Sequence, residues 1–336
     1  MKKLIAILLS AFLLVAGVGL FAGCEGFSGL LQVSVLQYAE HGSLDNCYNG
    51  IVEGLAERGY TEENTNVSRR NAKGNDSENL TAAQTIINSM PDVAVGIATP
   101  SAYALASAAR GDVPVVFTAV SDPTAESADF SEFDNVTGSS DQLPVERQLQ
   151  LIRDFFDAKG ETDTITVAIV YTLTEANSVS QIAQFEAKES EFDVDIISRG
   201  ITDATELAAA VDALIAEGAD CFNNLTDNTV VQNLSTLLDR ANGSNIPVFG
   251  SEIEQVEKGC IASVSLDYVE LGRQTGYMIA DILDGTKTAD EIEFLYIEDG
   301  YTVDYNSTVM EPLGFTLPEG EAYTTANNVT AGVNAA

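Results

Sequence analysis

Small and polar residues follow four segments that have the apolar, β-branched pattern of buried strands. These polar segments are 98–102, 118–123, 226–229 and 250–252. In open parallel sheets, ligands bind beyond the carboxyl ends of the strands, near the N-termini of the next helices. The free amides of a helix N-terminus suit a carboxylate, whereas Asp227 or Glu252 suits an ammonium group. The pattern therefore predicts a cleft that holds a zwitterion, with its carboxylate near Ser101.

The candidate ligand-binding residues lie at these strand ends and after two further strands. They are Gln37, Tyr38, Thr99, Ser101, Ala102, Thr118, Ala119, Ser121, Asp227, Glu252 and Asp267. Several have a structural alternative, because Ser, Thr and Asp at such positions also cap helices. Tyr38 either stacks on a ring of the ligand or merely covers the edge of the sheet.

The single histidine limits catalytic and metal chemistry. A Ser-His-Asp or Cys-His arrangement would have to use His41, and a zinc site would have at most one imidazole. The other interpretation of His41 is a loop residue after the first strand. The sequence has no GxSxG, GxxxxGK[ST] or HExxH motif. We predict that the protein is not an enzyme and has no catalytic residue, metal site or cofactor.

The N-terminus has the pattern of an export signal. Two lysines precede an almost purely apolar run over residues 4–22. Small residues then lead to Cys24, as in a bacterial lipobox, so we expect residues 1–23 to be removed and Cys24 to carry lipid. The alternative is an uncleaved transmembrane anchor, because the run is long enough to span a bilayer. Three other cysteines form no metal-binding spacing and allow at most one disulfide.

Length and charge narrow the class of protein. The chain has 336 residues and a formal net charge of -35, with 45% apolar residues. That length suits two lobes with real cores. The negative surface disfavours nucleic acid and anionic lipid headgroups as partners. We expect a monomer.

Strands and helices alternate in two successive runs. The first run covers strands at 31–39, 67–72, 93–99 and 113–120, with helices at 44–58, 77–90 and from 100 onward. The second covers strands at 164–171, 194–201, 219–225 and 247–251, with helices at 176–190, 205–216 and 228–241. This alternation predicts an α/β fold of two doubly wound, Rossmann-like lobes joined by crossover hinge strands. We assign 24–30 to a tether, 31–142 and about 253–290 to the N-terminal lobe, 143–252 and about 291–323 to the C-terminal lobe, and 324–336 to a tail.

An ordered set of short motifs is similar to one known family. The motifs lie at 44–45, 50–60, 96–102, 117–123, 135–138, 227–229 and 271–276, and include GIATPSA and FTAVSDP. Together they resemble the ABC-transporter substrate-binding lipoproteins of the tryptophan/tyrosine-binding type. The resemblance covers about residues 31–290, whereas Tyr103 and the stretch 251–254 depart from it.

The resemblance implies a type I periplasmic-binding-protein fold that closes by a hinge on an aromatic amino acid. Carried over by position, Thr99, Ser101 and Ala102 face the ligand carboxylate, Thr118 and Ser121 line the same wall, and Asp227 meets the ammonium group. The resemblance also implies an ABC permease as partner and a lipid-anchored location on the outer face of the cell membrane. A ligand-binding sensor, an extracytoplasmic enzyme, and a nucleoside or another polar solute as ligand remain alternatives.

Overall fold

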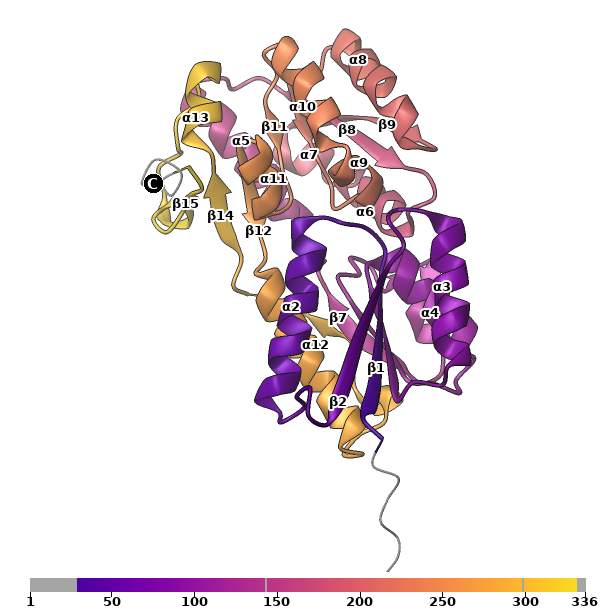
Figure 1. Ribbon diagram of the computed structural model, residues 1–336. Coiled ribbons are helices and arrows are strands. Elements are labelled where there is room, and N and C mark those ends of the chain that lie inside the picture. The colour runs from indigo at the N-terminus through magenta and orange to yellow at the C-terminus, as the bar shows by residue number, and fades with distance from the viewer. Residues whose placement is uncertain (1–28, 143, 298, 331–336) are drawn as a thin grey trace, which may run out of the picture.

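The computed structural model describes residues 29–142, 144–297 and 299–330, which form two α/β lobes (Figure 1). The predicted signal segment and Cys24 lie outside the described residues. The first lobe, below in Figure 1, surrounds one six-stranded sheet. The second lobe, above, contains a four-stranded and a three-stranded sheet. The predicted fold class of two doubly wound lobes is confirmed.

The first lobe has a parallel sheet in the order β13-β7-β4-β3-β1-β2. Its elements are β1 (Leu31–Gln37), α2 (Gly42–Glu57), β2 (Thr65–Asn71), α3 (Asp76–Asn88), β3 (Val93–Ile97), α4 (Thr99–Ala109), β4 (Val115–Thr118), β7 (Val136–Ser140), α12 (Tyr268–Leu283) and β13 (Leu295–Tyr296). Every residue of β3 and β4 is buried, as expected for a sheet covered on both faces. Helices α2 and α12 cover one face, and α3 and α4 cover the other (Figure 1).

The second lobe repeats this architecture around the parallel sheet β11-β10-β8-β9. Its elements are α5 (Val145–Lys159), β8 (Ile165–Thr172), α6 (Ala176–Glu186), α7 (Glu189–Phe192), β9 (Val194–Ile201), α8 (Leu207–Glu217), β10 (Cys221–Asn223), α9 (Asn228–Gln232), α10 (Leu234–Gly243), β11 (Val248–Phe249) and α11 (Ile253–Lys258). The three-stranded sheet adds β12 (Ala262–Ser265), β14 (Thr302–Tyr305) and β15 (Asn327–Asn328), and α13 (Ser307–Met310) follows β14.

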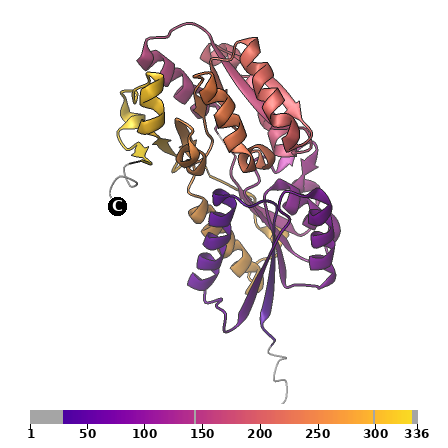
Figure 2. The ribbon, with the colours of Figure 1, turned by 45° about the horizontal axis from the view of Figure 1, so that its top comes forward.

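The chain crosses between the lobes at places that differ from our assignment. Among the described elements it crosses between β7 and α5, between β12 and α12, and between β13 and β14 (Figure 2). We placed 253–290 in the first lobe, but β12 pairs with β14 and a bridge joins Ser263 to Gly250. We placed 291–323 in the second lobe, but β13 pairs with β7 in the first. Part of the predicted tail is also structured, because β15 pairs with β14.

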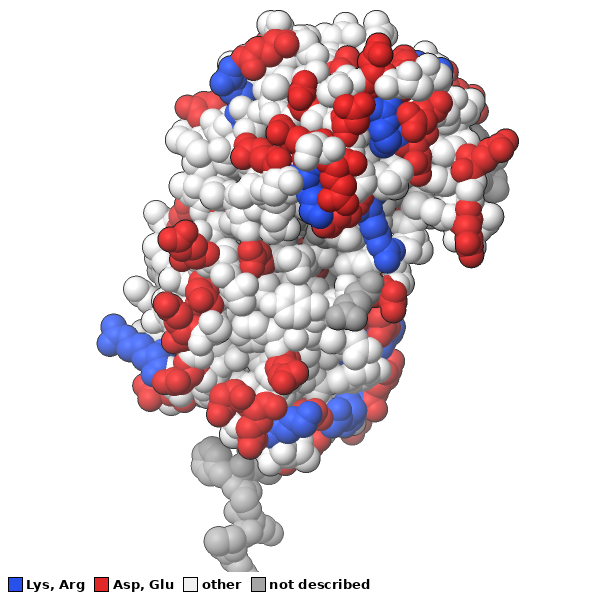
Figure 3. All heavy atoms as spheres, turned by 180° about the vertical axis from the view of Figure 1, so that it is seen from behind, with Lys and Arg blue, Asp and Glu red and all other residues white. Residues whose placement is uncertain are grey.

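Acidic side chains spread over both lobes of the molecule. Figure 3 shows many red carboxylates and few blue side chains on the face seen from behind. None of the described helices is both long and apolar enough to cross a membrane. The acidic surface does not by itself determine the charge of the ligand. The charged groups of the interior are the main determinants.

Candidate ligand-binding cleft

A small cavity of about 10 Å³, roughly the room of one water molecule, lies between the two lobes. The first lobe contributes His41, Leu44, Ala98, Thr99, Ala119, Ser121, Asp141 and Tyr268. The second lobe contributes Asn177, Thr226, Asn228 and Glu252. Thr99, Ala119, Ser121 and Glu252 were predicted from the sequence, and the structure brings these four together. A cavity lined by both lobes is the arrangement that hinge closure requires.

The backbone is turned sharply where two strands of the first lobe meet the cavity. Ala98, after β3, has φ of 74°, and Ala119, after β4, has φ of 53°. Such left-handed conformations are unfavourable for alanine and persist where the surrounding structure holds them. At Ala98 the turn starts α4, so the positive end of that helix reaches the cavity at Thr99. A ligand carboxylate is stabilised in such a place.

Two helices of the first lobe are held together by glycines, and this positions two cavity residues. A Cβ atom at Gly50 would lie 2.0 Å from the Val269 carbonyl oxygen, and one at Gly272 would lie 2.1 Å from that of Cys47. The backbones of α2 and α12 therefore touch. Their N-termini meet at the cavity, where His41 and Tyr268 lie.

Asp141 is the main acidic group on the first-lobe wall. It follows β7, is 3% exposed, and accepts hydrogen bonds from Ser121 Oγ at 3.0 Å and Tyr268 Oη at 2.9 Å. Burial raises the pKa of this carboxyl, and the two hydrogen bonds oppose the rise. None of the lining residues is Lys or Arg. Among the described residues, Asp141 therefore forms no ion pair, and its carboxylate can hold an ammonium group.

Glu252 is the acidic group on the second-lobe wall. It is 1% exposed, accepts from Gln255 Nε2 at 3.1 Å, and also accepts from Ser43 Oγ of the first lobe. Burial raises the pKa of Glu252, and the charge of Asp141 raises it further. Asn177, on the same wall, is 2% exposed and its Oδ1 atom has no hydrogen-bond partner. This wall thus presents acceptors to the cavity.

Asp227 does not lie at the cavity, although we predicted that it meets the ammonium group. Its carboxylate accepts from Thr172 N (2.6 Å), Thr172 Oγ1 (2.8 Å), Ser178 Oγ (2.8 Å) and Val230 N (2.9 Å). It caps α9 and is fully buried. Four donors fill the usual capacity of a carboxylate. The structure thus places Asp227 in the framework of the second lobe.

Glu175 accompanies Asp227 in this framework. It accepts from the backbone and side chain of both Asn228 and Thr229, at 2.7 to 3.0 Å. Burial, together with the charge of Asp227, raises the pKa of Glu175 to about 8. These four hydrogen bonds fix the start of α9 and hence the position of Asn228 on the cavity wall.

The remaining predicted residues do not line the cavity: Asp267 is exposed at the start of α12, and the others lie behind the cavity walls. Gln37 donates to the Ala39 carbonyl at 2.8 Å, Tyr38 donates to Asp76 at 2.8 Å and belongs to the core, Ser101 donates to Asn79 at 2.6 Å, Thr118 accepts from Ser139 at 2.9 Å, Ala102 packs against Gly96, and Asp267 caps α12. For Tyr38 and Asp267 the structural alternative accounts for the observed contacts. These residues support the residues that line the cavity.

Sequence reasoning did not select several lining residues. Asp141 directly follows a strand, next to the place where we put the boundary between the lobes. Its position beyond a strand end is the signal that could have identified it. Asn177 and Tyr268 lie at helix starts, where the sequence gives no sign that they face a ligand. His41 occupies the N-cap position of α2, with Nδ1 unpaired and burial lowering its pKa to about 4.

Hydrogen bonds between the lobes hold the cleft closed. Ser121 Oγ lies 3.2 Å from Thr226 Oγ1, and Asn46 Nδ2 donates to Glu254 at 2.7 Å. His41 Nε2 lies 3.4 Å from Asn228 Oδ1, and Ser180 donates to Asp122. These pairs can form only when the lobes approach. The described conformation is therefore closed.

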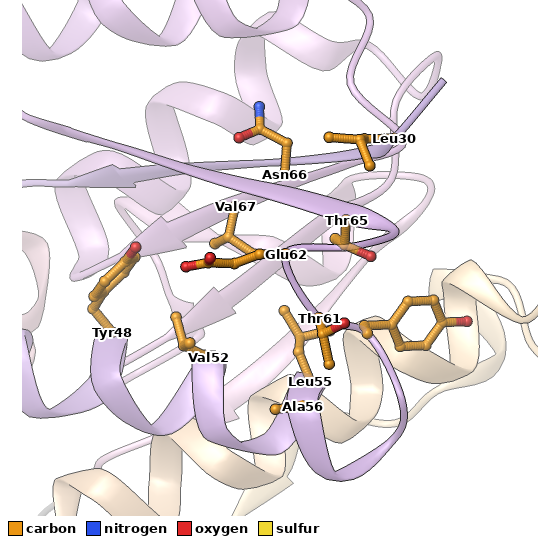
Figure 4. A pocket seen from close by; sticks show the side chains of 11 residues that line it. Leu30, Tyr48, Val52, Leu55, Ala56, Thr61, Glu62, Thr65, Asn66 and Val67 are labelled. Carbon is orange, nitrogen blue, oxygen red and sulfur yellow. The ribbon is translucent and has the colours of Figure 1, made fainter. Parts of the chain in front are cut away.

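A larger groove lies elsewhere in the first lobe. It is formed by α2 and the edge strand β2 and is lined by Tyr48, Val52, Leu55, Tyr60 and Val67 among others (Figure 4). Its only ionisable lining residues are Glu62 and the two tyrosines. It lacks the convergent charged and polar groups of the interlobe cavity, which is the better site for a small polar ligand.

The sequence matches one protein-family model over nearly its whole length. The model describes ABC transporter substrate binding proteins and matches residues 32–329. The chain belongs to this family. A curated relative, the tyrosine-binding protein of Clostridioides difficile, is 26% identical over 324 residues, which cover 89% of this chain and 91% of the relative.

Solved structures agree with the family and with the closed arrangement. An ABC domain from Streptococcus pneumoniae in complex with L-Trp is 32% identical, with a TM-score of 0.80 over 87% of this chain and 97% of that chain. A ligand-free, open substrate-binding protein with adhesive properties from Clostridium difficile is 27% identical, with a TM-score of 0.65 over 89% and 99%. The substrate-binding protein described here resembles the ligand-bound structure more than the open one. Its fold is that of type I periplasmic binding proteins.

Proposed function

We propose that the protein captures an aromatic amino acid outside the cytoplasm and delivers it to an ABC permease. The observation that carries this proposal is the interlobe cavity with two buried carboxylates and no Lys or Arg in its lining. The cavity combines a helix N-terminus for a carboxylate with Asp141 for an ammonium group. The relatives named for tyrosine and found with L-Trp support an aromatic side chain.

Capture follows from the distribution of contacts between the lobes. The first lobe offers Thr99 and Asp141, whereas the second offers Asn177 and Glu252. A ligand that contacts both sets binds the closed state more tightly, and this difference shifts the population toward closure. The closed state is then the form that a permease recognises. Lipid on Cys24 would keep the protein near that permease.

Binding can be tested on the soluble form that starts at Glu25. The melting temperature should rise with tryptophan, tyrosine or phenylalanine, because a ligand that binds only the native state stabilises it. Isothermal titration calorimetry then gives the Kd of each ligand. Glucose and adenosine serve as matched polar controls. A rise with adenosine and none with any amino acid would overturn the proposed ligand class.

The lipid anchor needs a separate test in cells. The unmodified chain should enter the membrane fraction and incorporate labelled palmitate, whereas Cys24→Ala should do neither. Cys47→Ala is a matched control, because Cys47 is buried and free within the first lobe. A Cys24→Ala protein that stays in the membrane fraction would show that the apolar N-terminal run itself is the anchor.

A further inference from the structure

The cavity has more acceptors than the head group of an amino acid can use. Asp141 and Glu252 each receive two hydrogen bonds from the protein, whereas a carboxylate takes about four. Asp227 and Glu175 of the same lobe framework each receive four. The cavity carboxylates thus keep unused acceptor capacity in a place where water is largely excluded. Buried acceptors without donors cost free energy, so a ligand should supply donors.

Asp141 and Glu252 lie on opposite walls of the cavity. The first-lobe wall has the groups that can bind both charged groups of an amino acid. Thr99 at the start of α4 suits the ligand carboxylate, and Asp141 on the same wall suits the ammonium group. Both charged groups of an α-amino acid sit on one carbon atom, so they bind close together. The second wall then meets the side chain of the ligand.

The second wall offers acceptors to that side chain, and its two amide NH2 groups each already donate one hydrogen bond within the lobe. Asn177 Oδ1 is buried without a partner, while its Nδ2 already donates to the Thr226 carbonyl at 3.3 Å. The Nδ2 atom of Asn228 donates to Glu175 at 2.7 Å. Glu252 adds a carboxylate. Ligand groups that only accept hydrogen bonds, and purely apolar groups, would leave these acceptors unpaired.

We infer that the ligand carries a ring N–H or O–H group, and that Glu252, assisted by Asn177, accepts a hydrogen bond from it. Glu252 is then the residue that distinguishes tyrosine or tryptophan from phenylalanine. This inference rests on the proposed function and deepens it. A site built to accept from a ligand donor rejects the analogue without it much more strongly than an apolar pocket does.

This inference can be tested with pairs of ligands that differ only in whether they carry the hydrogen-bond donor. Calorimetry on the soluble form should give Kd values about 100-fold weaker for phenylalanine than for tyrosine. The same comparison applies to tryptophan and 3-(3-benzothienyl)alanine, in which sulfur replaces the indole N–H. Glu252→Met should reduce these ratios to about threefold or less, and Glu252→Gln, which keeps an acceptor oxygen, should restore part of them.

Glu254→Gln is the matched control. Glu254 lies on the same short helix and also accepts from Ser43, at 2.9 Å, but it is not among the residues that line the cavity. It should leave the ligand ratios unchanged even if it weakens closure for all ligands. Equal binding of phenylalanine and tyrosine by the unmodified protein, or unchanged ratios in Glu252→Met, would overturn the inference alone. A protein that binds no aromatic amino acid would overturn the proposed function as well.

Discussion

Two pairs of buried carboxylates lie within the interlobe region and have opposite roles. Asp227 and Glu175 each accept four hydrogen bonds from their own lobe, and two of the four come from backbone N–H groups at each residue. Asp141 and Glu252 accept two each and line the cavity. Residue type and burial are the same in both pairs. We propose that unused hydrogen-bonding capacity, rather than charge, separates an acid that binds ligand from one that holds the fold.

The largest effect should come from Asp227→Ala and should fall on stability. The substitution leaves two backbone N–H groups and two hydroxyls buried without an acceptor, so the free energy of unfolding should fall by about 3 kcal/mol or more. Urea denaturation measures this loss. The Kd for ligand should change little in protein that remains folded.

The control for Asp227 is Asp267→Ala, which removes a carboxylate from an exposed helix cap. Asp267 accepts from Val269 N and Glu270 N, so its loss should cost only about 1 kcal/mol. A stable Asp227→Ala protein that no longer binds ligand would contradict the comparison and return Asp227 to the site.

The second largest effect should come from Asp141→Asn and should fall on affinity. Hydrogen bonds to charged groups contribute about 1.5–3 kcal/mol, so the Kd should weaken by about 10- to 100-fold. The shape of the side chain is kept, and one of the two hydroxyls, of Ser121 or Tyr268, retains an acceptor oxygen while the other faces the new NH2 group. Calorimetry measures the affinity and denaturation measures the stability, which should change by less than the binding energy. Unchanged affinity would remove Asp141 from the ammonium site.

Acidification should weaken binding at a pH above the usual carboxyl range. Burial raises the pKa of Asp141 and of Glu252 in the free protein, so both protonate at a higher pH than exposed carboxyl groups do. A ligand ammonium group needs the ionised form of Asp141, so affinity should fall by up to about tenfold per pH unit as Asp141 protonates, whereas a protonated Glu252 keeps one acceptor oxygen and should contribute a smaller loss. Calorimetry from pH 4.5 to 7.5 measures the slope, which Asp141→Asn should make shallower.

Acidification should affect folding in the opposite direction to binding, because protonation of Glu175 stabilises the folded protein. Its pKa is raised to about 8 in the folded protein, so its contribution to stability is fully present at low pH and is lost as pH rises through about 8. Glu254 at the lobe interface also has a pKa raised by burial, whereas the lowered pKa of His41, about 4, keeps it neutral. Weaker binding at low pH with a melting temperature that does not fall would therefore arise from the cleft. Binding that is constant from pH 4.5 to 7.5 would contradict the role of the cavity carboxylates.

The sequence predicted the framework better than the site, for a physical reason. Periodicity reports which face of an element is buried, and it placed the strand over 194–201 at the observed residues. It did not identify α5, whose apolar face packs in the second core, because we placed the boundary between the lobes just before it and began the second run only at 164. Lobe crossings depend on pairing between distant segments, such as β13 with β7, which periodicity does not report.

The site was harder to predict because the same residues serve two purposes. Thr99 and Ser121, selected as strand-end residues, line the cavity, yet the same rule selected Ser101, which donates to Asn79 behind the wall. Asp227 and Asp141 both follow strands. Only the number of nearby donors, which comes from tertiary packing, shows that the first is saturated and the second is not.

The smallest effect should come from Asn46→Ala, which acts on closure alone. Asn46 Nδ2 donates to Glu254 across the lobes at 2.7 Å, and neither residue lines the cavity. One partly exposed hydrogen bond contributes about 0.5–1 kcal/mol, so every ligand should bind about two- to fivefold more weakly. Calorimetry with tyrosine and phenylalanine tests whether both lose the same factor. The matched control is Asn66→Ala, whose amide donates to Gln32 at 2.8 Å within the first lobe and should leave both Kd values unchanged. A loss that differs between the two ligands would mean that the lobe interface takes part in ligand selection. The distinction between the cavity carboxylates and all other buried acids would then be wrong.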